Sequence, residues 1–170
     1  MPDPLVVTLA VDEDAQARLD ALRRAHFPPE RLLVPAHVSL FHALPGEHVD
    51  TVLGDVAAAS PRPFPVDVTG VRSLGRGCAL ELSSPDLLRL RARLAAAWEP
   101  WLTRQDAQRY APHVTVQNKV DPAVARALVE QLTASFVPWS MTATGVHVWR
   151  YVGGPWEAVA TVPFDSADGG

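Results

Sequence analysis

The chain carries the same four-residue pattern twice, at His37–Leu40 (HVSL) and at His113–Val116 (HVTV). In each copy a histidine and a hydroxyl residue alternate with two apolar residues, which is the period-two pattern of a β-strand. The histidine and the hydroxyl therefore share one face of each strand. Two such strands facing each other would supply two imidazoles and two hydroxyls, which can perform acid–base chemistry on a phosphodiester without a metal ion.

The sequence around the two motifs is repeated as well. A proline precedes each motif, at Pro35 and at Pro112. A Thr-Gly-Val triplet follows each motif at nearly the same spacing, after a predicted helix and a proline-containing break, and the triplets begin at Thr69 and Thr144. Two copies are too few for a solenoid, so the repeat predicts two related lobes about a pseudo-twofold axis, each contributing one histidine.

The predicted strands and helices follow the same order in both halves of the chain. The first half has a strand at 5–11, a helix at 13–25, the motif at 35–44, a helix at 48–59 and a strand at 64–71. The second half has a strand at 78–82, a helix at 85–101, the motif at 113–120, a helix at 122–134, and strands at 139–151 and 156–164. Asp12, Ser84 and Asp121 are predicted to open three of the helices.

We expect a single domain over residues 1–170, because the link at 73–77 between the two halves is no longer than a hairpin turn. The lobe-forming repeats span approximately 5–74 and 78–150, and the strand at 156–164 closes the fold.

The paired motifs in this repeated setting resemble the two-histidine phosphoesterase superfamily, in its LigT-like branch of 2'-5' RNA ligases and RNA 2',3'-cyclic phosphodiesterases. The resemblance covers nearly the whole chain, and the first motif departs slightly from the family pattern at Ser39, where threonine is commoner. It implies an α+β fold of two lobes, with two antiparallel sheets lining a central cleft and helices on the outside. It also implies that His37, His113, Ser39 and Thr115 face that cleft.

The resemblance further implies the reaction, which is hydrolysis of a 2',3'-cyclic phosphate end of RNA or of a nucleotide to a 2'-phosphate. In the family pattern His37 is the acid and His113 the base, whereas the sequence itself treats the two histidines alike. Ser39 and Thr115 would donate hydrogen bonds to the non-bridging phosphate oxygens. The reverse reaction would join RNA ends by a 2'-5' bond without ATP.

Two other functions stay open, because a fold alone does not fix a function. One is a sister enzyme that acts on small cyclic nucleotides or on a cyclic ADP-ribose phosphate. The other is a nucleotide-binding protein with little turnover. The expected partners are accordingly an RNA 3'-terminal cyclic phosphate or a small cyclic nucleotide.

Two further residues fall on the motif faces if the alternation continues beyond the motifs. Phe41 would follow Ser39 and could stack on a base, although core packing is the commoner role of such a ring. Lys119 would follow Thr115 and could pair with phosphate, and a solvated strand end is an equal alternative. His42 is predicted to point the opposite way and to be structural. The late tryptophans are predicted to pack within a sheet and not to form a base-binding site.

The composition limits the class of partner. The net charge is −4, so the chain lacks the overall basic footprint of a protein that grips long RNA, and only a short RNA end or a small nucleotide is expected. No cofactor and no metal are expected, since the sequence has no Walker loop, Rossmann glycine pattern, His-Glu-x-x-His helix or cysteine pair. The single cysteine, Cys78, is expected in the core, and the enzyme is predicted to be a cytoplasmic monomer without membrane contact.

Overall fold

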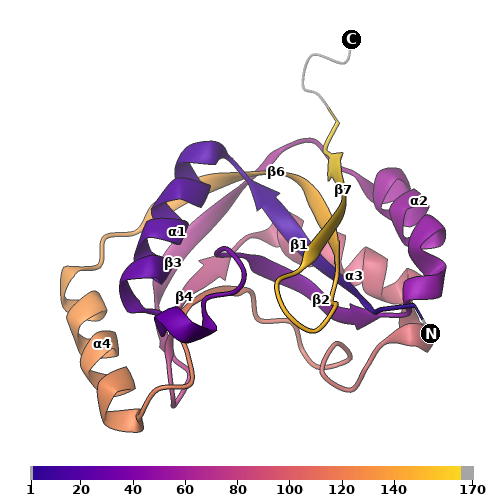
Figure 1. Ribbon diagram of the computed structural model, residues 1–170. Coiled ribbons are helices and arrows are strands. Elements are labelled where there is room, and N and C mark those ends of the chain that lie inside the picture. Colours follow the sequence, from indigo (N-terminus) through magenta and orange to yellow (C-terminus); the bar gives the residue numbers. More distant parts are fainter. Residues whose placement is uncertain (1, 166–170) are drawn as a thin grey trace.

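The computed structural model describes residues 2–165, and this part of the chain forms seven strands and four α-helices (Figure 1). The strands are β1 (Leu5–Val11), β2 (Val38–Leu44), β3 (Phe64–Ser73), β4 (Cys78–Ser83), β5 (His113–Gln117), β6 (Trp139–Arg150) and β7 (Glu157–Pro163). The helices are α1 (Glu13–His26), α2 (Val49–Ala59), α3 (Pro85–Ala97) and α4 (Pro122–Ser135). Every element predicted from the sequence is present.

Two elements end three or more residues earlier than predicted, each for a local reason. The helix predicted to reach residue 101 ends at Ala97, and a separate 3-10 turn with a proline near its start, Glu99–Trp101, follows it. The second motif strand, predicted to reach residue 120, ends at Gln117. Lys119 adopts a left-handed backbone conformation, with φ at 60°, and an extended strand cannot continue through that conformation.

The predicted helix starts depend on local capping. The Asp12 carboxylate accepts hydrogen bonds from Ala15 N in the first turn of α1 (2.9 Å) and from Thr142 N in β6 (2.8 Å), so it fixes the helix to the sheet. Ser84 Oγ accepts a hydrogen bond from Leu87 N (3.2 Å) and caps α3. Asp121 occupies the corresponding place before α4, but its side chain makes no capping hydrogen bond.

All seven strands belong to one antiparallel sheet with the order β2-β1-β6-β3-β4-β5, and β7 pairs with the second half of β6. This corrects the predicted arrangement of two sheets in two lobes. The last strands of the two repeats, β3 and β6, pair directly from Phe64 opposite Ala143 to Val68 opposite Trp139. The two halves are therefore joined edge to edge into a single curled sheet, a half-barrel flanked by α1 and α4 at one end and α2 and α3 at the other (Figure 1).

The internal repeat is visible in this strand order. Exchanging β1 with β4, β2 with β5 and β3 with β6 reverses the order and preserves each pairing. The two motif strands, β2 and β5, consequently occupy the two opposite ends of the six-strand path. The curl of the sheet brings these ends back into contact with each other, so the two histidine motifs meet.

The Thr-Gly-Val triplets mark equivalent bulges in β3 and β6. Along β3 the pairing with β4 passes from Val68 to Gly70 while β4 advances by one residue, so Thr69 is the extra residue. Along β6 the pairing with β1 skips Thr144 in the same way. Bulges increase the local twist of a strand, which favours curling of the sheet.

One apolar core fills the space between the sheet and the helices. Its large, fully buried side chains come from both repeats and include Leu19 of α1, Val52 of α2, Leu94 of α3 and Trp98 directly after α3. Cys78 is buried in β4, as predicted. No helix among residues 2–165 is both long and apolar enough to cross a membrane.

Candidate active site

The two motif strands carry a second pair of equivalent bulges, one in each strand, directly after the hydroxyl residue. On β2, Ser39 and Phe41 are paired with successive residues of β1, so Leu40 is the extra residue. On β5, Thr115 and Gln117 are paired with successive residues of β4, so Val116 is the extra residue. A bulge changes the phase of the alternation, and the residues beyond it turn to the opposite face.

The bulges and the early end of β5 change three placements that a regular alternation predicts, and for Phe41 they favour the core role over the base-stacking role. Phe41 turns into the core, where it is 0% exposed and contacts Trp98 with ring centroids 4.9 Å apart, so its ring is not available to stack on a base. Gln117 is likewise buried. Lys119 lies beyond the end of β5, so no regular strand places it on the same face as Thr115. His42, predicted to point away, lines the same cavity as Ser39.

The two motif histidines are held by the same local hydrogen bond. His37 Nδ1 lies 2.8 Å from the carbonyl oxygen of Pro35, and His113 Nδ1 lies 2.9 Å from that of Ala111. A carbonyl oxygen only accepts hydrogen bonds, so in each ring Nδ1 carries the proton and Nε2 is the nitrogen left for a ligand. The repeat therefore presents two imidazoles in the same tautomer, each able to exchange a proton through Nε2.

Arg72 lies next to the His113 ring but does not form a hydrogen bond with it. Its Nη1 lies 3.2 Å from His113 Nδ1, but both nitrogens are donors once Nδ1 bonds the Ala111 carbonyl. The guanidinium instead donates to Glu81 Oε1 (3.1 Å) and to the Ala111 oxygen (3.4 Å). Arg72 therefore places a positive charge beside His113 without changing its tautomer.

A buried arginine joins the two motif regions. Arg23 of α1 is 4% exposed and donates from Nε to Val34 O (3.2 Å), just before β2, and from Nη1 to Thr115 O (2.8 Å) in β5. No sequence pattern points to this role, because it depends on α1 lying where β2 and β5 meet. Burial lowers the pKa of Arg23, and the nearby Asp20 carboxylate opposes that change.

The electrostatic environment favours a neutral His37 in the ligand-free protein. Burial lowers the pKa of His37 to about 4, and the charges of Arg23, His42 and His113 lower it as well, against the opposing hydrogen bond to Pro35. His113 is therefore close enough to His37 to interact with it electrostatically. A neutral imidazole at pH 7 is able to accept a proton.

Two cavities flank the His37–Ser39 segment. The first, of about 250 Å³, is lined by residues that include Ser39, His42, Arg72 and His113. The second, of about 280 Å³, is lined by His37 together with His147, Trp149 and Trp156. Thr115 shares a strand face with His113 but lines neither cavity, and the same is true of Lys119. A larger cavity between α1 and α4, of about 410 Å³, contains no motif residue.

Two tryptophans that sequence reasoning assigned to ordinary packing lie next to His37. The rings of Trp156 and His37 have centroids 4.7 Å apart, and Trp149 follows at 5.9 Å from Trp156. Trp149 Nε1 donates to Thr8 Oγ1 (3.0 Å), which fixes its ring on the sheet. Their proximity follows from the strand order β2-β1-β6 and from the pairing of β7, which begins directly after Trp156, with β6, and no local sequence signal reveals either.

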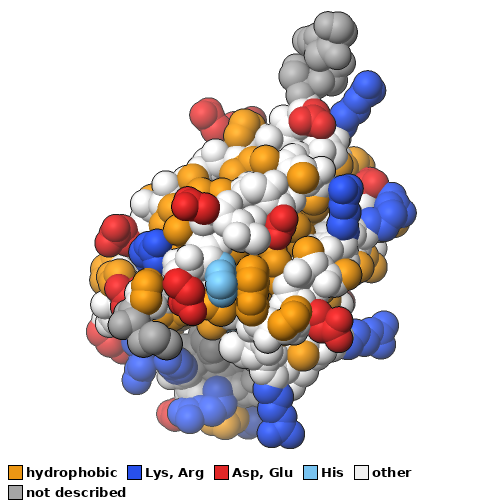
Figure 2. Space-filling model, turned by 90° about the vertical axis from the view of Figure 1, so that its right-hand side faces the viewer, with side chains coloured by type: hydrophobic (Ala, Val, Ile, Leu, Met, Phe, Trp, Pro, Cys, Tyr) orange, Lys and Arg blue, Asp and Glu red, His pale blue; other side chains and the backbone are white. Residues whose placement is uncertain are grey.

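The face shown in Figure 2 carries scattered acidic and basic side chains and no continuous basic area. Within residues 2–165, no group of three or more histidine, cysteine or carboxylate side chains is placed to hold a metal ion.

Comparisons with known proteins agree with this fold. The 2'-5' RNA ligase superfamily matches residues 11–155. The TT0787 protein of Thermus thermophilus is similar in structure, with a TM-score of 0.69 at 16% identity over 96% of this chain and 99% of that one. E. coli LigT complexed with 3'-AMP has a TM-score of 0.67 at 17% identity over the same shares of the two chains. None of the curated protein sequences matches. The chain belongs to the 2'-5' RNA ligase superfamily, the two-histidine phosphoesterases that its paired motifs resemble.

Proposed function

We propose that the protein is a metal-independent phosphodiesterase that opens 2',3'-cyclic phosphate ends of RNA or of nucleotides to 2'-phosphates. The observation that carries this proposal is the pair of histidines at the starts of repeat-related strands, His37 directly before β2 and His113 at the first residue of β5, each with Nδ1 bound to the carbonyl two residues earlier. Two imidazoles in the same tautomer, close enough to interact, suit a reaction that needs one proton acceptor and one proton donor.

In the proposed reaction a neutral imidazole takes a proton from water as the water oxygen attacks phosphorus. The bond from phosphorus to the ribose 3'-oxygen breaks, and the other imidazole, protonated, donates its proton to that oxygen. Ser39 and Thr115 donate hydrogen bonds to the non-bridging oxygens, where negative charge increases in the transition state. With a 5'-hydroxyl RNA end in place of water as the nucleophile, the same groups would form a 2'-5' bond and release the 3'-oxygen without ATP.

The roles of the two histidines are open to test. The family resemblance makes His37 the acid, whereas burial in the ligand-free protein favours its neutral form and hence the base role. A bound phosphodiester adds a negative charge between the rings and so favours protonation of either one.

Two observations support a nucleotide as substrate. E. coli LigT, a structural relative, has been solved with 3'-AMP and with NADP+, and the Trp156 ring beside His37 offers this chain a surface on which a base can stack. The net charge of −4 favours a short RNA end or a free nucleotide over a long RNA.

A parallel assay tests this proposal against the two alternatives. Cyclic mononucleotides, oligonucleotides with a 2',3'-cyclic phosphate end, 2'-5' oligoadenylates and a cyclic ADP-ribose phosphate are incubated with the protein in EDTA, and with a His37→Ala, His113→Ala control. We expect a 2'-phosphate product from a 2',3'-cyclic phosphate, formed only by the wild type. Turnover confined to the cyclic mononucleotides or to the cyclic ADP-ribose phosphate would favour the sister enzyme, and tight binding without turnover would favour a nucleotide-binding protein.

A further inference from the structure

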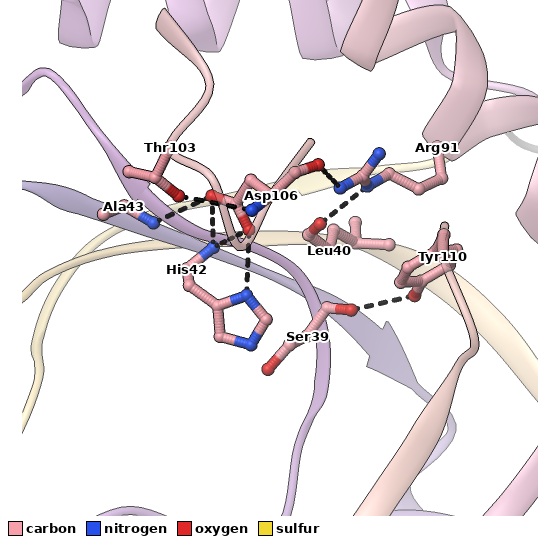
Figure 3. Close-up of polar contacts among 8 residues, drawn as sticks. All are labelled: Ser39, Leu40, His42, Ala43, Arg91, Thr103, Asp106 and Tyr110. Atoms are coloured by element: carbon pink, nitrogen blue, oxygen red, sulfur yellow. Dashed lines mark hydrogen bonds and ion pairs between the residues drawn. The ribbon is translucent and has the colours of Figure 1, made fainter. Parts of the chain in front are cut away.

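A third imidazole faces the candidate site, and a buried carboxylate holds it in place. His42 Nδ1 lies 2.9 Å from Asp106 Oδ1, and the side chains of His42 and Asp106 are 46% and 1% exposed (Figure 3). Burial raises the pKa of Asp106, but the hydrogen bonds from His42 and Ala43 outweigh burial and hold it below its ordinary value. Because an ionised carboxylate only accepts hydrogen bonds, Nδ1 of His42 carries the proton and Nε2 is left for a ligand.

The carboxylate is fixed by the bulged part of β2. Asp106 accepts the backbone N–H groups of both His42 (2.9 Å) and Ala43 (3.1 Å). In a regular strand successive N–H groups point to opposite sides, so one carboxylate can reach both only where the strand is irregular. The irregular register of β2 beyond Leu40 thus turns the His42 ring to the face of Ser39 and also creates the carboxylate site that holds this ring.

Two more side chains bind the loop of Asp106 to the free edge of β2. Arg91 is 7% exposed and donates to Leu40 O (2.8 Å) and to Asp106 O (2.7 Å) (Figure 3). Burial raises the pKa of Tyr110, so its hydroxyl stays protonated and donates to Ser39 O (2.8 Å). A network of this extent, with its polar groups paired, holds the loop firmly against the strand and so fixes the His42 ring.

The cavity that contains His42 differs in charge from the cavity on the other side of the motif. Three arginines (Arg72, Arg91 and Arg109), two histidines and one carboxylate line it. The carboxylate, Asp106, is already bound to His42 and to the backbone. The cavity beside His37 is lined by the carboxylates Glu13 and Asp20, by aromatic rings, and by no arginine or lysine of the described residues. The two cavities that flank the His37–Ser39 segment therefore differ in character, with His37 lining the aromatic cavity and His113 lining the cationic cavity.

We propose that the cationic cavity is a subsite for a second phosphate group of the substrate, contacted by His42 Nε2 and Arg109. This inference rests on the proposed function and adds an orientation to it. The base lies toward Trp156, the reacting phosphate lies between His37 and His113, and the second phosphate lies beside His42. In a nucleotide this group is the 5'-phosphate, and at an RNA end it is the phosphate that precedes the terminal nucleoside.

Binding of the product nucleotides tests the subsite without relying on turnover. Calorimetric titrations compare adenosine 2',5'-bisphosphate with adenosine 2'-monophosphate, and a dinucleotide that ends in a 2'-phosphate separates the two sources of the second phosphate. We expect the wild type to bind the ligands with a second phosphate roughly 10- to 100-fold more tightly, as is typical of a charge-assisted hydrogen-bonded contact. His42→Gln and Arg109→Gln should each reduce this preference at least about 5-fold.

The outcomes separate this inference from the proposed function. Arg126→Gln, which removes an exposed charge on α4 away from the cavity, is the matched control and should keep the wild-type preference. Equal binding of mono- and bisphosphate by the wild type would overturn the subsite, and so would a preference that survives both His42→Gln and Arg109→Gln. Absence of hydrolysis with the preference intact would overturn the proposed function alone, whereas hydrolysis without the preference would overturn the subsite alone.

Discussion

Arg23 Nη1 donates a hydrogen bond of 2.8 Å to the carbonyl oxygen of Thr115, 92 positions later in the chain. Because its Nε also bonds Val34 O, this one guanidinium ties the segment that leads into β2 to the middle of β5. The two motif strands, β2 and β5, lie at opposite ends of the strand order and do not pair with each other in the sheet. A direct side-chain link between them therefore helps to set their spacing.

Replacing Arg23 by methionine keeps most of the buried volume but leaves two backbone carbonyls without their donor. We expect the free energy of unfolding to fall by about 2–4 kcal/mol, because each buried acceptor loses a charged partner. Denaturant unfolding measures the change, and Arg126→Met on the exposed face of α4 is the control. An Arg23→Met variant as stable as wild type would mean that the link does not hold the strands.

The paired histidines predict a strong and non-additive loss of activity. His37→Ala and His113→Ala should each lower the rate on the best substrate by roughly 10²- to 10⁴-fold, since one turnover needs both proton transfers. The double variant should be little worse than the poorer single variant, because the two groups act as a unit. Near-full activity in either single variant would rule out a two-histidine mechanism.

A substrate whose leaving group needs no protonation shows which histidine is the catalytic acid and which is the base. On a p-nitrophenyl phosphodiester, the variant that lacks the acid should recover most of its activity relative to wild type, whereas the variant that lacks the base should stay impaired. Recovery by His37→Ala would support the acid role implied by the family. Recovery by His113→Ala would support the base role of His37 that its lowered pKa favours. Recovery by both or by neither would show that the roles are not divided in this way.

The lowered pKa of His37 also predicts a pH-dependent loss of stability. The pKa of His37 is about 4 in the folded protein against an ordinary value of 6.5, so between these values the unfolded state binds more protons. The stabilising contribution is complete above pH 6.5 and is lost as the pH falls toward 4. Relative to His37→Asn, the wild type should lose about 1–3 kcal/mol of unfolding free energy over this range. If the unfolding free energies of the two proteins change equally with pH, the pKa of His37 is not lowered in the folded state.

The order of the elements and the two motif histidines were predictable because both depend on local patterns. Alternation locates β2 and β5, and capping residues such as Asp12 locate the helix starts. The single sheet was not predictable, because the pairing of β3 with β6 joins strands far apart in the chain. The errors at Phe41 and His42 have one cause. The bulge at Leu40 is defined by the register against β1, and a strand's own sequence does not report its partner's register.

A substitution at Thr115 separates a catalytic role of its hydroxyl from a purely binding role. A donor directed at charge that increases in the transition state affects kcat more than substrate binding. Thr115→Val keeps the shape and the strand propensity but removes the donor. We expect kcat to fall by about 10- to 10³-fold, at or below the range for the loss of one oxyanion donor. Steady-state kinetics on a 2',3'-cyclic phosphate measures both parameters.

The control is the equivalent change in the other repeat, Ser39→Ala, which should behave alike if the two strands act symmetrically. Some increase in KM is expected in both variants, because the phosphate is already anionic in the ground state. A rise in KM with kcat unchanged would assign Thr115 to uniform binding of the ground and transition states. If neither parameter changes, the Thr115 hydroxyl does not reach the phosphate. That result would agree with its place outside both cavities and would leave Ser39 as the principal donor.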